Sequence, residues 1–314
     1  MEYITTLAPD EPIAITIGNF DGIHKGHQRL LHRLSAMAQE LHCKPVLVTF
    51  EPHTLMVVKP DIDLRYLTTL EEKLALAKRY SGIADTIVIR FTPQVAAMSA
   101  EEFMDHLYTH FTLKGLVVGA NFSLGHNRMG DVAFLQRYGQ EHAIDVYAIP
   151  LEEIKRSRIS STRIRALVGE GEIIEASNLL GHPVTASGIV VHGDHRGRQI
   201  GFPTANLAPD AHKLLPANGV YAARVCIEPD TAESDSASSS RVYNSAVNIG
   251  VRPTFQGQTR LVEAHLLDVD LDLYEKRITL DFIERLRGEQ RFAGIEPLKA
   301  QIMHDVQQAR QILQ

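Results

Sequence analysis

The chain has 314 residues, of which 44% are hydrophobic and 22% charged, and its formal net charge is −6. This length exceeds one typical domain and the composition is that of a soluble globular protein, so we expect two domains. The acidic balance and the lack of a long run of Lys and Arg exclude a general nucleic-acid binder, so any phosphate site must be local.

The sequence also bears on where the protein works. No segment reaches the roughly 18 apolar residues that cross a bilayer, and the N-terminal residues do not predict a signal peptide. We therefore expect a cytoplasmic protein without a membrane partner. Cys43 and Cys226 lie far apart in the sequence, so we interpret them as small buried apolar residues and not as a disulfide or a metal site.

The first distinctive stretch is a short apolar strand over 13–17, followed by a glycine-rich turn that opens into a helix. Free backbone N–H groups and the positive end of the helix dipole favour phosphate at such a place. Gly18, Gly22 and Gly26 would let the backbone approach the phosphate closely, and His24 and His27 lie in the same turn. A lone histidine at a helix start is usually solvated or capping, but two in this setting favour a phosphate site.

The rest of the first half alternates helices and strands. Apolar spacing predicts a helix over 27–41 and strands over 44–50, 86–90, 115–119 and 145–148. Thr69 and Ser99, each followed three residues later by Glu, predict two helix starts, and another helix is expected over 131–142. Repeated strand–helix–strand units imply a doubly wound parallel α/β sheet, whose ligands lie beyond the carboxyl ends of the strands.

Unusual residues follow the predicted strands at that edge. They are found over 19–27, 51–53, 119–125 and 158–165. The last segment joins a Ser/Thr cluster, which would open a helix, to Arg158, Arg163 and Arg165. Two plainer interpretations stay open, because Pro52 alone explains an irregular loop and the arginines could form a solvated basic face.

The second half differs in character. Gly181-His-Pro183 would end a helix predicted over 172–180, so we place the domain boundary there, with domains over 1–182 and 183–314. Short alternating strands over 184–191, 219–226, 243–249, 260–266 and 277–286 predict a small antiparallel β-barrel with a C-terminal helix over 297–313. The Ser-rich residues 229–240 are expected to form a long loop without catalytic role.

Two features of this half indicate chemistry. The stretch 187–206 is a glycine-rich loop with arginines that would offer amides and charge to a phosphate, and Thr204 and Asn206 offer oxygen ligands suited to Mg²⁺. A turn-rich barrel corner is the alternative. Glu263 lies in an otherwise apolar strand, where an acidic residue needs a partner or a catalytic task.

The motifs resemble those of known families. Gly18-Asn-Phe-Asp-Gly-Ile-His24-Lys-Gly-His27 and Ile159-Ser-Ser-Thr-Arg-Ile-Arg165 resemble two signatures of the nucleotidylyltransferase superfamily. Gly197-Arg-Gln-Ile-Gly-Phe-Pro-Thr-Ala-Asn206 resembles the signature of riboflavin kinase. Nearly the whole chain is similar to the bacterial bifunctional riboflavin kinase/FAD synthetase family. This resemblance implies a Rossmann-like nucleotidylyltransferase domain followed by a riboflavin kinase-like barrel.

The resemblance also implies roles for single residues in each half. In the first half His24, His27, Arg158 and Ser161 would act on the reacting phosphates, and Asn121 would lie near the flavin phosphate. The ATP contacts expected there are Gly18, Phe20, Gly22, His24, Gly26, His27, Thr162 and Arg165. In the second half Glu263 would be the general base that takes the proton of the ribityl 5′-hydroxyl. The other contacts expected in that half are Gly193, Gly197, Arg198, Gly201, Pro203 and Thr204 to ATP, Asn248 and Arg287 to flavin, and Thr204 and Asn206 to Mg²⁺.

The implied function is ATP-dependent phosphorylation of riboflavin to FMN by the second domain and adenylyl transfer from ATP to FMN by the first, which yields FAD. Riboflavin, FMN and ATP with Mg²⁺ would be the ligands and flavin-dependent apoproteins the recipients, and the oligomeric state is open. Two alternatives are a kinase whose first domain is inactive or serves another nucleotide, and a flavin carrier without chemistry. Departures from the family pattern at Thr54, Ser123, Leu124 and His182 would bear on flavin affinity.

Overall fold

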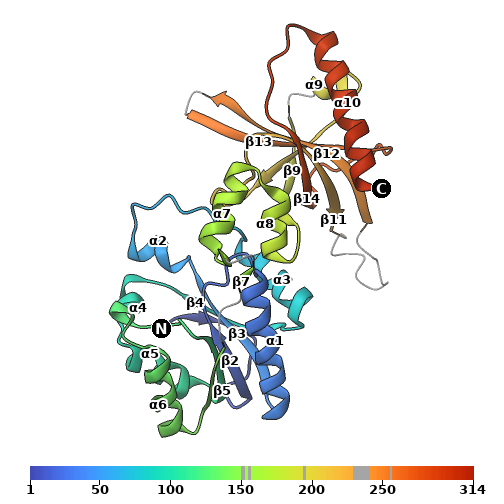
Figure 1. Ribbon diagram of the computed structural model, residues 1–314. Helices are drawn as coiled ribbons and strands as arrows, with labels where there is room; N and C mark the ends of the chain where they lie inside the picture. The colour runs from blue at the N-terminus through green and yellow to red at the C-terminus, as the bar shows by residue number, and fades with distance from the viewer. Residues whose placement is uncertain (150–152, 155–156, 194–195, 229–240, 255–256) are drawn as a thin grey trace. The chain divides into compact units, whose positions relative to one another are not determined.

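The computed structural model describes residues 1–149, 153–154, 157–193, 196–228, 241–254 and 257–314. Figure 1 shows its two compact units, Met1–Ser161 and Thr162–Gln314. Helices α7 (Ser161–Glu170) and α8 (Ile173–Leu180) lie between this division and the boundary that we expect after residue 182. The expected boundary therefore stays a prediction about function, and each unit is described by itself.

The described part of the first unit holds a six-stranded sheet in the order β1-β4-β3-β2-β5-β6. The strands are β1 (Tyr3–Ile4), β2 (Pro12–Ile17), β3 (Lys44–Glu51), β4 (Asp85–Arg90), β5 (Thr112–Gly119) and β6 (Asp145–Ile149). β2 to β6 pair in parallel, and β1 adds an antiparallel edge to β4. The chain winds from β2 toward β4 and then returns past β2 to β5 and β6, so the predicted doubly wound α/β fold is confirmed.

Helices cover both faces of this sheet (Figure 1). On one face, α1 (Lys25–Glu40) and α3 (Leu70–Ser81) pack against Ala14, Leu47 and Val117. On the other, α5 (Ala100–His110) and α6 (Val132–His142) pack against Ile15 and Val48. Successive strand residues point to opposite faces, which explains why the strands are apolar along their whole length.

The helix starts are capped as predicted. The side chains of Thr69 and Ser99 accept hydrogen bonds from the backbone N–H groups of Glu72 and Glu102, whose carboxylates accept from the two caps in return. Several short elements were not predicted, because one turn of helix or a strand of two residues is too short to show a period. They are β1, α2 (Thr54–Val58), α4 (Pro93–Ala97), the 3₁₀ turn η1 (His126–Arg128), β7 (Glu153–Ile154), β8 (Ser157–Arg158) and α9 (Arg196–Gln199).

The described part of the second unit forms a closed barrel in the order β10-β13-β12-β11-β14-β9, which confirms the predicted antiparallel barrel. Its strands are β9 (Val184–Val191), β10 (Ala205–Pro209), β11 (Gly219–Ile227), β12 (Arg241–Thr254), β13 (Gly257–Leu266) and β14 (Arg277–Arg287). Strand β10 was missed, because the sequence of Pro203 to Asn206 is typical of a turn. Residues 229–240, expected to form a loop, lie outside the described residues.

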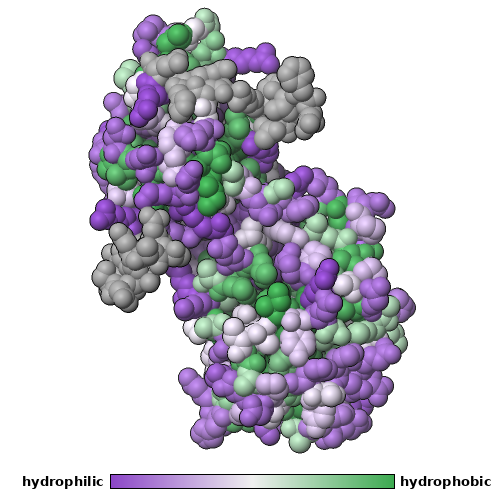
Figure 2. Space-filling view, turned by 180° about the vertical axis from the view of Figure 1, so that it is seen from behind, coloured by the Kyte–Doolittle hydropathy of each residue, from purple (hydrophilic) through white to green (hydrophobic). Residues whose placement is uncertain are grey.

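Helix α10 (Ile295–Leu313) lies along the barrel (Figure 1). Ala309 and Leu313 of this helix pack against Ala222 and Ala246 of the barrel. Among the described helices, none has both the length and the apolar character that a bilayer crossing requires. The surface drawn in Figure 2 is mostly hydrophilic, with apolar side chains in small groups.

Cys43 and Cys226 are both free thiols. Each side chain is only partly buried, so the interpretation of both as buried residues is wrong. Cys43 follows α1 and its connecting turn, and Cys226 is the second-last residue of β11, so neither lies in the buried middle of an element. The two cysteines belong to different units.

Candidate functional site

A pocket of about 360 Å³ lies in the first unit where the strand order reverses between β2 and β5. Ligands of doubly wound sheets bind at this position. Several residues predicted from the sequence line the pocket together, namely Gly18, Phe20, His24, Gly26, His27, Asn121 and Ser161. The carboxyl ends of β2 and β5 and the start of α7 therefore converge on one cavity, as expected.

The turn after β2 is anchored by Asp21, a residue that sequence reasoning passed over. Its side chain is 2% exposed. Its carboxylate accepts hydrogen bonds from the backbone N–H groups of Leu67 and Thr68 at 3.2 and 3.0 Å and from the Thr68 hydroxyl at 3.3 Å. The same hydroxyl accepts the N–H of Gly22, whose φ of 85° suits glycine. These bonds fix the turn that would surround a phosphate.

His24 and His27 form a stacked pair at the start of α1. The ring centroids are 3.6 Å apart, and His24 Nδ1 accepts the backbone N–H of His27 at 3.2 Å. His24 is thus the N-cap of the helix, and its neutral ring carries the proton on Nε2. The plain capping interpretation of His24 is therefore correct, and its ring lies on the wall of the pocket.

The environment keeps His27 uncharged. Burial lowers its pKa well below the ordinary value, and the neighbouring His24 and Lys73 lower it further. Lys73 is itself 5% exposed and donates from Nζ to the Thr49 hydroxyl at 3.2 Å. Burial also lowers the pKa of Lys73, against the opposing effect of Asp21 and Glu51. Among the described residues, buried His27 Nδ1 has no hydrogen-bond partner, which a ligand could provide.

The structure says less about the other residues predicted for this site. The Ser161 hydroxyl donates to the backbone carbonyl of Asp21 at 2.9 Å. The side chain of Arg158 lies outside the described part of the structure. Thr162 and Arg165 belong to the second compact unit, so their contacts with phosphate stay predictions. Arg163 forms an ion pair with Glu175 of α8.

Two cations that sequence reasoning missed, Arg29 and Arg128, also line the pocket. Arg29 lies in α1, where an amphipathic pattern indicates only a solvated position. Arg128 donates from Nε to the Ser123 hydroxyl at 2.8 Å. The departure from the family pattern at Ser123 therefore supplies a partner for a cation of the pocket.

Thr54, Leu124 and His182, the other residues that depart from the family pattern, also contact the rest of the protein. Asn19, which lines the pocket, donates to the Thr54 hydroxyl at 2.9 Å and accepts the Thr54 backbone N–H at 3.2 Å. Leu124 is buried in the core of the sheet. Buried His182 contacts the Pro183 carbonyl through Nδ1 at 2.8 Å. Each of the three side chains is thus part of the packed structure.

Two pockets are formed by described residues of the barrel, one on each side of β13. One, of about 410 Å³, is lined by polar residues that include Arg198, Asn206, Asp270 and Asp272. The other, of about 380 Å³, is largely apolar and contains Glu263. Glu263 and His265 line the apolar pocket while Ala264 and Leu266 line the polar one, as the two-residue period of a strand requires. Among the described lining residues, Thr204 is common to both.

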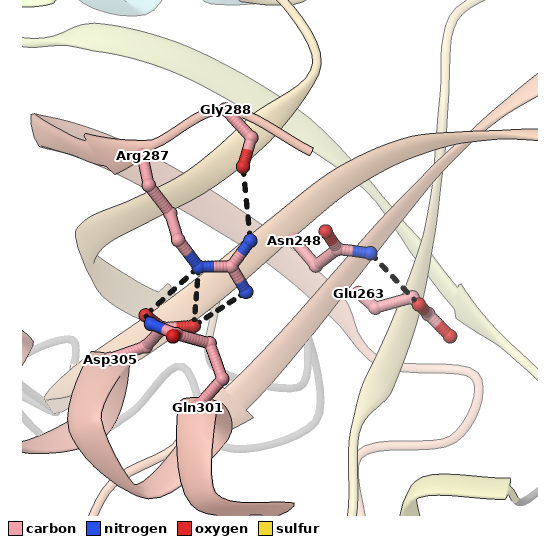
Figure 3. A network of polar contacts seen from close by, with 6 residues as sticks. All are labelled: Asn248, Glu263, Arg287, Gly288, Gln301 and Asp305. Atoms are coloured by element: carbon pink, nitrogen blue, oxygen red, sulfur yellow. Dashed lines mark hydrogen bonds and ion pairs between the residues drawn. The ribbon is translucent and has the colours of Figure 1, made fainter. Parts of the chain in front are cut away.

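Glu263 is held by its neighbour on the next strand. Asn248 lies directly opposite it on β12 and donates from Nδ2 to Glu263 Oε2 at 3.4 Å (Figure 3). Asn248 lines the apolar pocket as predicted for a flavin contact, and it also orients the carboxylate. The acidic side chain in an apolar strand therefore has both a partner and a cavity.

Arg287, the second predicted flavin contact, ties β14 to α10. It donates from Nε and Nη2 to the carboxylate of Asp305, which is 4% exposed, and from Nη1 to the Gly288 carbonyl (Figure 3). Gln301 donates to the same carboxylate at 2.8 Å. Arg287 lines the apolar pocket, but most of its hydrogen bonds stay within the protein.

Two glycines of the loop before β10 lie close to the segment that carries Thr204 and Asn206, the residues predicted to bind Mg²⁺. A Cβ on Gly193 would lie 2.3 Å from the Asn206 amide, and one on Gly197 would lie 2.3 Å from the Phe202 carbonyl. At Gly197 only glycine fits beside the Phe202 backbone, whereas a side chain at Gly193 would displace the Asn206 amide. A hydroxyl, an amide oxygen and the carboxylates of Asp270 and Asp272 line one pocket, and Mg²⁺ prefers such oxygen ligands.

Comparisons with known proteins agree with this geometry. A family model described as FAD synthetase matches residues 7–163, and one described as riboflavin kinase matches residues 180–313. A protein of Escherichia coli (strain K12), named "Bifunctional riboflavin kinase/FMN adenylyltransferase", is 38% identical over 97% of this chain and 94% of its own length. One of the same name from Pseudomonas fluorescens is 36% identical over 94% of this chain and 91% of its own length.

A solved structure extends the likeness to the fold. A crystal structure from Streptococcus pneumoniae, titled as a macrolide-efflux protein, has a TM-score of 0.83 and 27% identity over 96% of this chain and 99% of its own. Both compact units thus have counterparts in that structure. Because the chain is 38% identical to such a relative over nearly its full length and matches both family models, it belongs to the family of bifunctional riboflavin kinases/FMN adenylyltransferases.

Proposed function

We propose that the barrel unit phosphorylates riboflavin to FMN with ATP, and that the α/β unit transfers an adenylyl group from a second ATP to FMN, giving FAD and pyrophosphate. One observation carries this assignment. A single chain matches both family models, each over the unit whose pockets fit the corresponding reaction. The two activities are those named for its relatives.

In the kinase reaction, we assign ATP to the polar pocket and riboflavin to the apolar pocket. The ribityl 5′-oxygen attacks the γ-phosphorus in line, the bond to the β-phosphate oxygen breaks, and ADP leaves. Glu263, oriented by Asn248, takes the hydroxyl proton. Thr204 lines both pockets, so its position suits the place where the two substrates meet.

Further contacts of the kinase site are part of the proposal. Arg198 and Pro203 line the polar pocket and would contact ATP, and Asn248 and Arg287 line the apolar pocket and would contact the flavin. We keep Gly193, Gly197 and Gly201 as ATP contacts from the sequence, although Gly197 lines the apolar pocket. Mg²⁺, held by Thr204 and Asn206, would neutralise charge on the phosphates.

In adenylyl transfer, a phosphate oxygen of FMN attacks the α-phosphorus of ATP and pyrophosphate leaves, so no general base is needed. Donors that stabilise the negative charge are the essential parts. His24 and His27 supply ring N–H groups, and the start of α1 supplies backbone N–H groups. We include Arg158, Ser161, Thr162 and Arg165 as phosphate ligands, and Asn121 near the flavin phosphate.

The domain boundaries and the location of the enzyme in the cell are part of the same proposal. We keep the adenylyltransferase over 1–182 and the kinase over 183–314, with α7 and α8 serving the first reaction. We place the enzyme in the cytoplasm, where flavin-dependent apoproteins would receive its FAD.

The test uses the purified full chain with riboflavin, ATP and Mg²⁺, resolving both products over time. FMN is expected first and FAD after it. FMN that accumulates without FAD, even when FMN is supplied as substrate, would favour a kinase whose first domain serves another purpose. A chain that binds flavin and forms neither product would be a carrier, and the proposal would be wrong.

A further inference from the structure

His265 lies on β13 two residues after Glu263 and lines the same apolar pocket. Nothing in the kinase chemistry described so far uses it. Its ring packs edge-on against Phe202, with centroids 5.5 Å apart and an interplanar angle of 79°. The side chain thus lies two residues along β13 from the proposed base and contacts the segment that leads into Thr204.

The hydrogen bond of this ring fixes its tautomer. His265 Nδ1 lies 2.8 Å from the backbone carbonyl oxygen of Pro203. A carbonyl can only accept, so Nδ1 must carry the proton, and in the neutral ring Nε2 is an acceptor. His265 therefore donates a hydrogen bond across from β13 to the residue that precedes Thr204.

Among the described residues, the segment Phe202 to Thr204 has few other backbone hydrogen bonds. Strand β10 begins at Ala205, so Pro203 and Thr204 lie just before its ladder, and proline has no N–H to donate. The backbone N–H of Phe202 donates to the Gly197 carbonyl at 2.8 Å, which holds the segment at its other end. The position of Thr204 between the two pockets thus depends on the carbonyl that His265 binds.

We propose that His265 is a positioning residue of the kinase reaction: its Nδ1–H bond to the Pro203 carbonyl fixes Thr204 where the two pockets meet. This inference rests on the function proposed above for the barrel. Phosphoryl transfer depends on the alignment of its reacting groups, and a misplacement of about 1 Å can cost about 100-fold in rate. The side chain acts through Pro203 and needs no contact with substrate.

The test compares three variants of the full chain. An Asn amide N–H can take the place of Nδ1–H, whereas a Gln amide reaches the place of Nε2. His265→Ala and His265→Gln are expected to lower kcat for riboflavin phosphorylation by about 100-fold, and His265→Asn is expected to restore most of it. Exposed His304 on α10 provides the control, since His304→Asn should behave as wild type. FAD formation from added FMN reports in each variant whether the first unit is intact.

A second readout does not depend on activity. The ¹⁵N shifts of the His265 ring in the wild-type protein, assigned by comparison with His265→Asn, should show a protonated Nδ1 and an unprotonated Nε2. The inference is overturned if Nε2 carries the proton, if His265→Gln works as well as His265→Asn, or if His265→Ala keeps the wild-type rate. A wild-type chain that does not phosphorylate riboflavin would refute the proposed function, while the ring shifts would still test the hydrogen bond.

Discussion

Buried polar side chains around the α/β pocket determine its shape without facing the substrate. Asp21 accepts three hydrogen bonds from Leu67 and Thr68, and Lys73 supports Thr49, whose hydroxyl donates to the Asn19 carbonyl at 3.2 Å. Removing one partner of such a bond leaves a buried group unsatisfied, at a cost of about 1–3 kcal/mol. The turn after β2 is therefore held by these hydrogen bonds before any ligand binds.

Sequence reasoning found the residues of this site that belong to a motif and missed those that support them. His24, His27, Asn121 and Ser161 were predicted and line one pocket. Lys73 was missed because its helix position indicates a solvated charge, and Arg128 because it lies in an irregular loop. Contacts with residues distant in the sequence place both side chains, and a local sequence pattern gives no information on such contacts.

The lowered pKa of His27 makes the stability of the first unit depend on pH. An unfolded chain takes up a proton on this ring near pH 6.5, but the folded ring stays neutral because it is buried beside His24 and Lys73. Stability is then fully present above about pH 6.5 and falls as the pH drops below it, by up to about 1.4 kcal/mol per pH unit.

Hydrogen exchange of the β2 and β3 core amides between pH 7.5 and pH 5.5 measures this dependence. We expect His27→Gln to flatten the decrease and His32→Gln, an exposed histidine of the same helix, to leave it unchanged. An identical slope in wild type and His27→Gln would contradict the assigned cause.

At the scale of elements, apolar strands and amphipathic helices were predictable, whereas single helical turns and two-residue strands were not. The strand over 184–191 has the predicted bounds, and α1 and α6 differ from prediction by one or two residues. β10 escaped because its residues are typical of a turn, yet pairing with β9 and β13 makes it a strand. The closure of the barrel thus overrides local preference.

Helix α10 is joined to the barrel by two ion pairs of different burial, which gives a matched comparison. Arg287 and Asp305 are 16% and 4% exposed, whereas Arg310 and Asp268 are 43% and 68% exposed. Asp305→Ala would leave the partly buried Arg287 charge without its carboxylate partner, so we expect a loss of about 3 kcal/mol, the low end for a buried pair. Asp268→Ala should cost less than about 1 kcal/mol.

Thermal unfolding of the full chain and riboflavin binding check this prediction together. Because α10 contributes to the wall of the apolar pocket, Asp305→Ala should also weaken riboflavin binding, and Asp305→Asn, which keeps an acceptor, should lie between it and wild type. Equal effects of Asp305→Ala and Asp268→Ala on the unfolding temperature would show that the buried pair has no special role.

At the scale of the whole molecule, one chain combines riboflavin kinase and FMN adenylyltransferase, two reactions that both act on riboflavin or its phosphate. The phosphate turn after β2 and the Glu263 pocket belong to different compact units. The motifs in the sequence were enough to predict both reactions, since each reaction needs a few residue types at fixed spacing. That α7 and α8 belong to the second compact unit could not be predicted, because it depends on tertiary contacts.

Paired variants test the central claim of two independent sites most directly. FMN formation from riboflavin and FAD formation from FMN are measured separately in the full chain. Glu263→Gln should lower the first rate by about 10²- to 10⁴-fold and leave the second unchanged. His27→Ala should lower the second rate by about 10²- to 10³-fold and leave the first unchanged. If either variant loses both activities to the same extent while still folded, the account of two separate sites is wrong.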